Sequence, residues 1–291
     1  MKVLHPKAAH DPAALERLER EARVAAAIHH PNVCSILDTG RVEDGRPYIV
    51  MERLYGETLR ACIARLGHLP TDAVLDMTMQ LLSGIDASHQ LGVVHRDLKP
   101  DNVFLVHRSG CHPMVKVLDF GLCRRVREPS KEHDKHRFDD RTLTNVGNVV
   151  GTPEYMAPEQ VSGTRNFDGR IDLYAIGIIL WEALTGSRAF AGNDIRRVLV
   201  SVLSKPLPPL RSLRPDLPVI LEDVVNRAIE RDPRLRYRSA SEMQHDLSIA
   251  RQEVVRQSFE PDPRDESMNR ERDGAEWEMP TKQIRPRLVA G

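Results

Sequence analysis

Apolar and polar positions along the chain predict a strand-containing region followed by a longer, mainly helical one. Between residues 33 and 52, apolar positions on both sides of the turn signal Glu43-Asp44-Gly45 predict two strands joined as a hairpin, the second at residues 48–51. Two further short strands are predicted around residues 103–106 and 115–118. The predicted strands therefore all lie within the first 118 residues.

Helical spacing predicts the other elements of the chain, most of which follow residue 118. Residues 172–185 are apolar on nearly every side, which is typical of a helix buried at the centre of a domain. Ser239 and Glu242 have the spacing of a capping box, so a helix is expected to begin there. Further helices, the capped one included, are predicted at residues 11–30, 70–92, 193–204, 217–231 and 239–255.

Two segments contain charges of both signs and few apolar residues. They are residues 124–141 and residues 251–291. Such segments cannot bury enough apolar surface to offset the entropy lost on ordering. A mobile loop and a disordered polar tail are therefore expected.

Composition narrows the class of protein. The 291 residues are 41% hydrophobic and 29% charged, an ordinary globular mixture. Lys plus Arg and Asp plus Glu are both 42, and the resulting net charge of zero argues against a dedicated nucleic-acid binder. No apolar run approaches the roughly 18 residues of a membrane-spanning helix, and the N-terminus is too polar for a signal peptide. Four scattered cysteines without Cys-x-x-Cys spacing fit reduced thiols and a cytoplasmic location.

The densest chemistry lies in residues 95–102, His-Arg-Asp-Leu-Lys-Pro-Asp-Asn, followed by Asp119-Phe120-Gly121. The side-chain oxygens of Asn102 and Asp119 suit Mg²⁺, which keeps its waters and bridges substrate phosphates. Asp97 can accept a proton from a hydroxyl, and Lys99 can neutralise charge on a moving phosphoryl group. A lone Asp-Phe-Gly is usually a surface turn, but both motifs in this order and spacing predict a phosphotransfer site.

With these motifs the chain resembles the protein kinases, from Lys2 to about Arg251. Residues 151–159, Gly-Thr-Pro-Glu-Tyr-Met-Ala-Pro-Glu, are similar to the end of the kinase activation segment. Lys99 together with Thr152 matches the serine/threonine type, and residues 17–33 are most like the bacterial, eukaryotic-like members. Small antibiotic phosphotransferases share the aspartate and asparagine arrangement but lack the Ala-Pro-Glu segment, so they are set aside.

The resemblance implies an α+β, bilobal protein kinase fold in residues 1–250. Residues 1–54 would form a partial small lobe and hinge, residues 55–250 a mainly helical large lobe, and residues 251–291 a disordered tail. The implied activity is transfer of the γ-phosphoryl group of ATP, with Mg²⁺, to Ser or Thr hydroxyls of protein substrates. A second copy of the chain is an expected partner, for autophosphorylation in trans.

The same resemblance assigns roles to the residues of the two motifs and of the hinge. Asp97 resembles the catalytic base, while Asn102 and Asp119 resemble the metal ligands. Met51 matches the gatekeeper at the hinge. The adenine would then meet the backbone of Glu52 and Leu54, with Leu105 beneath the ring.

Three residues of the large lobe match structural positions of the family. Asp172 resembles the aspartate that anchors the backbone of the catalytic loop. Arg236 resembles the arginine that pairs with the carboxylate at Glu159.

Control by phosphorylation is implied by Arg96, which stands beside Asp97. Arg96 and Arg124 would grip a phosphate, a dianion, on the activation loop. The expected phosphorylation sites, in order of preference, are Thr144, Thr142 and Ser130.

The sequence lacks the Gly-rich hairpin that covers the phosphates of ATP in the protein kinases. Lys2 and Glu21 match the pair that positions the α- and β-phosphates, but no Gly-x-Gly-x-x-Gly occurs in the sequence. Residues 2–4 would then form an edge strand at a terminus. Intact catalytic motifs favour a misplaced start or a gene fragment over a chain that truly begins at Met1. A catalytically impaired, kinase-like binding scaffold stays open as the alternative function, and an in-frame Gly-rich hairpin upstream would favour the enzyme.

Overall fold

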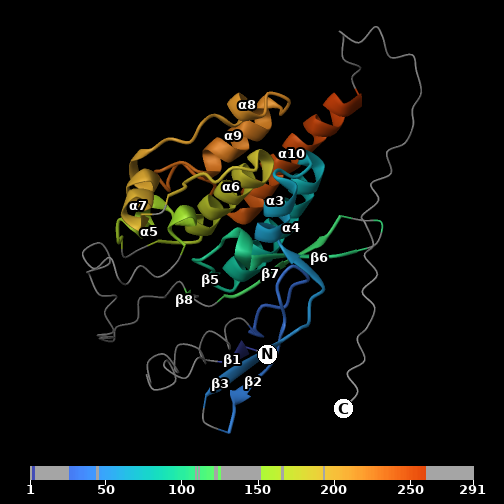
Figure 1. Cartoon of the computed structure of the whole chain (residues 1–291), viewed down its shortest axis with the longest axis vertical. Helices are drawn as coiled ribbons and strands as arrows, with labels where there is room; N and C mark the ends of the chain where they lie inside the picture. The colour runs from blue at the N-terminus through green and yellow to red at the C-terminus, as the bar shows by residue number, and fades with distance from the viewer. Residues whose placement is uncertain are drawn as a thin grey trace.

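The computed structural model describes residues 2–3, 26–43, 46–108, 110, 112–120, 124–125, 152–164, 167–192 and 194–259 of the chain. They form two parts, which we call the small lobe, up to residue 54, and the large lobe, residues 55–259. Figure 1 shows the strands of the small lobe at one end of the molecule and the helices of the large lobe at the other.

The small lobe contains a three-stranded antiparallel sheet. Its strands are β1 (Lys2–Val3), β2 (Ile36–Arg41) and β3 (Pro47–Met51), in the order β1-β3-β2. Strands β2 and β3 form the predicted hairpin, with Ile36 opposite Met51. Strand β1 lies at an edge of this sheet, and its Lys2 backbone pairs with Ile49.

A second antiparallel sheet lies between the small-lobe sheet and the helices (Figure 1). Its strands are β4 (Gly56–Thr58), β6 (Val103–Val106) and β7 (Met114–Val117), in the order β4-β6-β7. Gly56 is required because a Cβ at this position would lie 1.9 Å from the carbonyl oxygen of Leu105. The small lobe joins this sheet through the backbone: Cys34 N–H donates to Val117 O at 2.9 Å, and Val117 N–H donates to Asn32 O at 2.8 Å.

Helix α6 (Arg170–Thr185) is the core of the large lobe, and it is buried along nearly its whole length. Helices α4 (Thr71–Gln90) and α9 (Val219–Ala228) pack against it, and α10 (Ala240–Phe259) packs against α4 and α9. Gly177 lets α6 approach α9 closely, since a Cβ there would lie 2.8 Å from the Ala228 methyl group. These contacts explain why the predicted segment 172–185 is apolar on every side.

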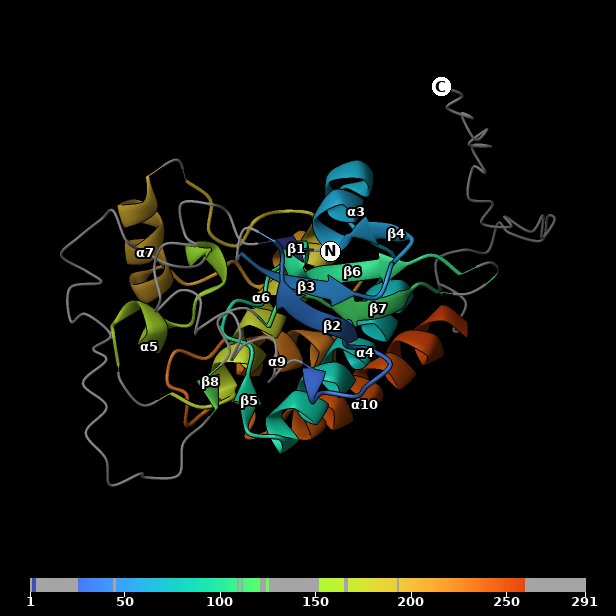
Figure 2. The same cartoon turned by 90° about the horizontal axis from the view of Figure 1, so that it is seen from below.

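Helix α7 (Ile195–Ser204) completes the set of longer helices, and all of these lie within a few residues of the predicted ranges. The structure adds three short helices that no pattern predicted: α3 (Leu59–Leu66), α5 (Pro158–Val161) and α8 (Leu210–Leu213). Figure 2 shows α5 and α7 on the opposite side of the large lobe from α10. The remaining elements are β5 (Val93–Val94), β8 (Arg124–Arg125) and the 3-10 turns η1 (Pro100–Asn102) and η2 (Pro153–Tyr155).

The C-terminal helix corrects two expectations. Helix α10 runs to Phe259, so the tail expected from residue 251 begins inside a helix, and residues 260–291 lie outside the described residues. The predicted capping box is only half formed. The Ser239 hydroxyl accepts from Glu242 N–H at 3.1 Å, but the Glu242 carboxylate accepts from Arg238 N–H at 2.6 Å, one residue before the serine.

Other predictions fall outside the described residues. They include most of the helix expected at residues 11–30 and most of the loop at residues 124–141. Cys34 and Cys62 are free and buried. Among the described helices, none combines the length and the apolar composition needed to cross a bilayer.

Candidate active site

The loop at residues 95–102 is held by a carboxylate from the core. Asp172, in the first turn of α6, is 1% exposed. Its Oδ1 accepts from Arg96 N–H at 2.8 Å, and its Oδ2 accepts from His95 N–H at 2.9 Å and lies 2.8 Å from His89 Nε2. Burial opposes ionisation, but the His89 contact and the Arg96 N–H together hold the pKa of Asp172 below its ordinary value. The charged carboxylate therefore fixes the backbone of the loop.

His95 ties this loop to the segment that carries Asp119. Its Nδ1 accepts from Asp97 N–H at 3.3 Å, so the proton lies on Nε2, which donates to Leu118 O at 2.9 Å. The His95 ring also packs against Phe120, with 4.8 Å between ring centroids. The two sequence motifs are therefore joined through one buried imidazole.

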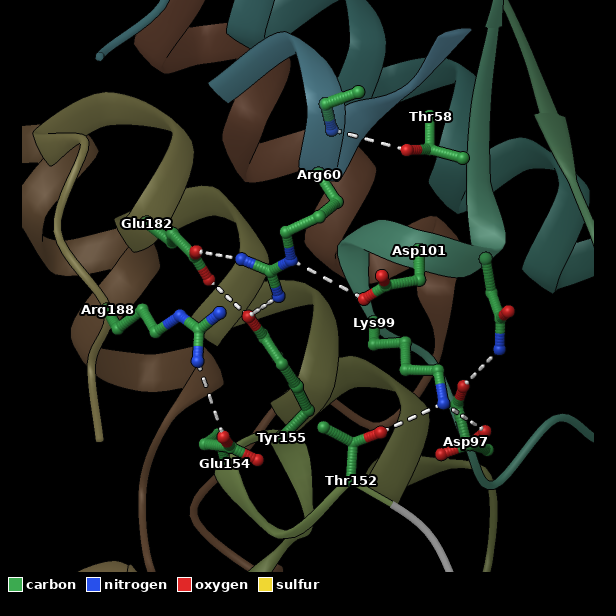
Figure 3. A network of polar contacts seen from close by, with 12 residues as sticks. Thr58, Arg60, Asp97, Lys99, Asp101, Thr152, Glu154, Tyr155, Glu182 and Arg188 are labelled. Carbon is green, nitrogen blue, oxygen red and sulfur yellow. Dashed lines mark hydrogen bonds and ion pairs between the residues drawn. The ribbon is translucent and has the colours of Figure 1, made fainter. Parts of the chain in front are cut away.

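Asp97, Lys99 and Asn102 lie together at this junction. Lys99 Nζ donates to Asp97 Oδ2 at 2.9 Å and to Thr152 Oγ1 at 2.8 Å (Figure 3). Asn102 Nδ2 donates to the carbonyl oxygen of Asp97 at 2.8 Å. A carboxylate, an ammonium group and a hydroxyl thus meet in one place, although Thr152 is 53 residues from Lys99.

Two residues of the site have strained backbones. Arg96 has φ 71° and Asp119 has φ 49°, and these are the described non-glycine residues with positive φ. Such conformations cost about 1–3 kcal/mol each and persist only where the surroundings enforce them. Here Asp172 holds the N–H of Arg96, and the neighbouring Leu118 O accepts from His95. Both strained residues belong to the two motifs of the candidate site, which is where such conformations are expected to gather.

A cavity of about 320 Å³ lies beside these residues. It is lined by Cys34, Met51, Glu52, Leu54, Phe104, Leu118 and Asp119. The three hinge residues of the sequence analysis therefore share one cavity with Asp119. Burial, with a contribution from nearby Glu52, raises the pKa of Cys34 to about 11, so this thiol stays protonated at neutral pH.

Leu105 does not line the cavity, which corrects its expected place beneath the adenine. It is 3% exposed and packs into the core, whereas its neighbour Phe104 lines the cavity. Successive side chains of a strand point to opposite faces, so only one of the two residues can face the cavity. The alternation along β6 was the signal that could have identified Phe104.

Lys116 is a residue of this region that sequence reasoning missed. It is 7% exposed, and its Nζ lies 2.7 Å from Glu52 Oε1 and 3.3 Å from the carbonyl oxygen of Val33. Glu52 also accepts from Ser35 N–H at 2.7 Å. Partial burial opposes ionisation of Glu52, but these hydrogen bonds lower its pKa. The signal was a lysine inside an otherwise apolar predicted strand.

The expected pair of Glu159 and Arg236 is bidentate, and its arginine is buried. Arg236 Nη1 and Nη2 donate to Glu159 Oε1 and Oε2 at 2.7 and 2.8 Å. The remaining N–H groups donate to carbonyl oxygens of Glu230 at 2.5 Å, Arg231 at 3.1 Å and Arg170 at 3.3 Å. All five donors of the guanidinium group are therefore used.

Several of the expected site residues cannot be compared with the site, since their side chains lie outside the described part of the chain. Lys2 has a described backbone in β1, and Glu21, Ser130, Thr142 and Thr144 lie outside the described residues.

Arg96 and Arg124 were expected to bind phosphate. The structure describes the side chain of Arg96 but only the backbone of Arg124. Arg124 has a described backbone, which pairs with Val94. The Arg96 guanidinium lies over the Phe167 ring, 5.0 Å from its centroid.

Comparison with known proteins decides the family. The family model described as a protein kinase domain matches residues 1–248. The chain belongs to the protein kinase family. Its α+β fold, with few small-lobe strands and a helical large lobe, agrees with this membership.

Two relatives that match are bacterial serine/threonine-protein kinases. Serine/threonine-protein kinase Pkn1 of Myxococcus xanthus is 41% identical over 247 residues, 85% of this chain and 34% of the relative. Serine/threonine-protein kinase PknB of Mycobacterium leprae (strain TN) is 35% identical over 251 residues, 85% of this chain and 38% of the relative. The chain thus spans a third or slightly more of the length of these two relatives.

A solved structure shows the same kinase fold. The crystal structure of the Mycobacterium tuberculosis PknI kinase domain matches with a TM-score of 0.61 and 28% identity. The match covers 86% of this chain and 84% of the solved one.

Proposed function

We propose that this kinase domain transfers the γ-phosphoryl group of ATP to serine or threonine hydroxyls of protein substrates. The observation that carries the proposal is the Lys99 ammonium group held between the Asp97 carboxylate and the Thr152 hydroxyl, close to a cavity that Asp119 lines. The names of the relatives, which are serine/threonine-protein kinases, support the choice of acceptor.

The residues at the site divide the chemistry between them. Asp97 Oδ2 is engaged by Lys99, so the other carboxylate oxygen is the one we assign to orient the substrate hydroxyl and take its proton. Lys99 supplies positive charge where the transferred phosphoryl group carries negative charge. Thr152 holds the ammonium group in place from the opposite side.

Asn102 and Asp119 fit a Mg²⁺ ion. The nitrogen of the Asn102 side chain is committed to the Asp97 carbonyl, so its oxygen is the atom left for a hard cation. No cluster of three or more His, Cys, Asp or Glu among the described residues is placed to hold a metal, so a ligand set of two side chains plus phosphates is the one we propose. When bound, Mg²⁺ neutralises the charge of the phosphates.

The cavity suits the adenine end of ATP. Its volume of about 320 Å³ is within the range of small-ligand pockets. The N–H of Glu52 already donates to Ser35 O at 3.0 Å, so we assign the carbonyl oxygen of Glu52 and the N–H of Leu54 to the adenine edge. Met51 and Phe104 would pack on the ring.

Regulation by phosphorylation remains part of the proposal. Arg96 stands next to Asp97 in the loop that Asp172 anchors, so a phosphate bound by Arg96 and Arg124 would act on the catalytic loop directly. Thr144, followed by Thr142, is the proposed site. The scaffold alternative gains no support from any observation on the described residues.

Mg-ATP-dependent phosphorylation by this chain tests the proposal. The wild type and an Asp97→Asn variant are incubated with labelled ATP, with and without an added acceptor protein, and circular dichroism establishes that both are folded. We expect incorporation that requires the wild-type aspartate, with phosphate on Thr142 or Thr144 by mass spectrometry. Equal incorporation by Asp97→Asn, or none by a folded wild type, would refute the proposed function.

A further inference from the structure

Arg60, in the first turn of α3, connects three other elements of the large lobe. Its Nη1 donates to Glu182 Oε1 at 2.6 Å, its Nη2 donates to the Tyr155 hydroxyl, and its Nε lies 3.4 Å from Asp101 Oδ2 (Figure 3). The guanidinium group also lies over the Tyr155 ring, 5.6 Å from its centroid. No family motif in the sequence analysis included this arginine.

Glu182 explains why a cation is needed here. It is 2% exposed and belongs to α6, whose other residues are mostly apolar. A buried carboxylate without a partner is strongly destabilising. Arg60 satisfies one of its oxygens, and the Tyr155 hydroxyl donates to the other. Arg60, Tyr155 and Glu182 therefore form a closed ring of hydrogen bonds, which we call the Arg60 ring.

The members of the Arg60 ring keep their hydrogen-bonding roles at neutral pH. Burial and the charge of Glu182 raise the pKa of Tyr155, so the phenol stays protonated and remains a donor. Desolvation opposes the charge on Arg60, but Tyr155 and Glu182 outweigh it and raise the pKa of the guanidinium group. Tyr155 and Arg60 therefore both remain hydrogen-bond donors in the ring at neutral pH.

The Arg60 ring is linked to two parts of the candidate active site, the Thr152–Tyr155 turn and the catalytic loop. Tyr155 N–H donates to Thr152 O at 3.1 Å within η2, and the Thr152 hydroxyl accepts from Lys99 at 2.8 Å. Asp101 lies in η1, between Lys99 and Asn102. A shift of Arg60 would therefore be transmitted to Thr152 on one side and to the catalytic loop on the other.

We propose that Arg60 is a positioning residue that holds the Thr152–Tyr155 turn and the catalytic loop in the geometry needed for phosphoryl transfer. This role rests on the proposed kinase activity. Arg60 is not among the residues that line the cavity, so its loss should affect turnover and the protein acceptor rather than nucleotide binding. Small displacements of catalytic groups are enough to lower a rate strongly.

The kinetic test compares Arg60→Ala with Arg65→Ala. Arg65 is a matched control, since it lies on the same helix and is paired with Glu57, but its side chain is 52% exposed. We expect Arg60→Ala to lower kcat about 10-fold or more, with the KM for ATP within about twofold of the wild type, and Arg65→Ala to change neither. Methylguanidinium added to Arg60→Ala should restore part of kcat. Equal kcat in the two variants, or a fall in kcat matched by an equal rise in the KM for ATP, would overturn the proposal.

A second measurement does not depend on catalysis. Hydrogen–deuterium exchange should be faster in Arg60→Ala over residues 97–102 and 152–161, and unchanged in Arg65→Ala. Tyr155→Phe removes only the hydroxyl group and should show the same regional increase, even if Arg60→Ala fails to fold. Unchanged exchange over both regions would overturn the positioning role. A wild type without Asp97-dependent transfer would instead refute the kinase proposal, and the exchange comparison would still decide the role of Arg60.

Discussion

The ion pair between Glu159 and Arg236 holds α5 to the core of the large lobe, and we predict that the fold depends strongly on it. Arg236 is 1% exposed, and its five donors reach the Glu159 carboxylate and three backbone carbonyls. The guanidinium group also lies 4.9 Å from the centroid of the Tyr174 ring. Arg236→Ala removes all of these contacts and leaves a largely buried carboxylate without a counter-charge.

The expected cost is large compared with the stability of a domain. Removing one partner of a buried ion pair costs about 3–5 kcal/mol. For a domain of this size, 1 kcal/mol shifts the melting temperature by about 2–4 °C, so Arg236→Ala should melt about 6–20 °C lower. Arg236→Lys should fall between the wild type and the alanine variant, since an ammonium group has three donors for five acceptors and cannot form the bidentate pair.

Thermal unfolding followed by circular dichroism measures this effect. Arg234→Ala is the matched control: Arg234 is paired with Asp232 two residues away and is 86% exposed, so its removal should leave the melting temperature unchanged. The double variant Glu159→Met, Arg236→Met should be more stable than either single variant, because it leaves no lone buried charge. An Arg236→Ala protein that melts within about 2 °C of the wild type would refute the reasoning.

Three other features of the site give expected outcomes. Against the opposing effect of burial, the His89 contact and the Arg96 N–H hold the folded pKa of Asp172 below its ordinary value. Its contribution to stability is therefore complete above the unfolded pKa of about 3.9 and is lost as the pH falls through the folded pKa, so acid should lower the melting temperature of the wild type more steeply than that of Asp172→Asn. Parallel curves would contradict this. Phe104→Ala should raise the KM for ATP about tenfold, whereas Leu105→Val should lower the melting temperature and leave the KM unchanged; the reverse pattern would restore Leu105 to the adenine site. Lys116→Met leaves the Glu52 carboxylate without its ion-pair partner, so Mg-ATP should raise the melting temperature less than in the wild type, and an equal rise would show that the pair does not affect the hinge.

Periodicity predicted the long elements because each of them buries one continuous apolar surface. Helices α4, α6 and α10 and the β2–β3 hairpin lie close to their predicted ranges. The short helices α5 and α8 span four residues each, about one turn, so no repeat could reveal them. Helix α10 runs to Phe259 rather than to its predicted end at residue 255, because residues 256–258 are polar and no apolar repeat marks the last turn.

In the candidate site, too, residues within short motifs were predicted from the sequence, whereas contacts between distant residues were not. Asp97, Lys99, Asn102 and Asp119 were identified from the sequence because they lie in two short motifs whose chemistry is readable from residue type and spacing. Thr152 was matched only through the family resemblance, and its hydrogen bond to Lys99 became visible only in the fold. Local sequence therefore predicted the family of the protein, which the comparison with known proteins confirmed.

Tertiary structure alone decided which side chains surround those motifs. Lys116 and Glu52 are 64 residues apart, and Arg60 and Glu182 are 122 residues apart, so no local pattern relates the members of either pair. Phe104 rather than Leu105 faces the cavity because the pairing of β6 with β4 and β7 sets which strand face meets the hinge. Local sequence specifies residue type and backbone period, whereas the burial and pairing of a charge depend on where the whole chain brings its partner.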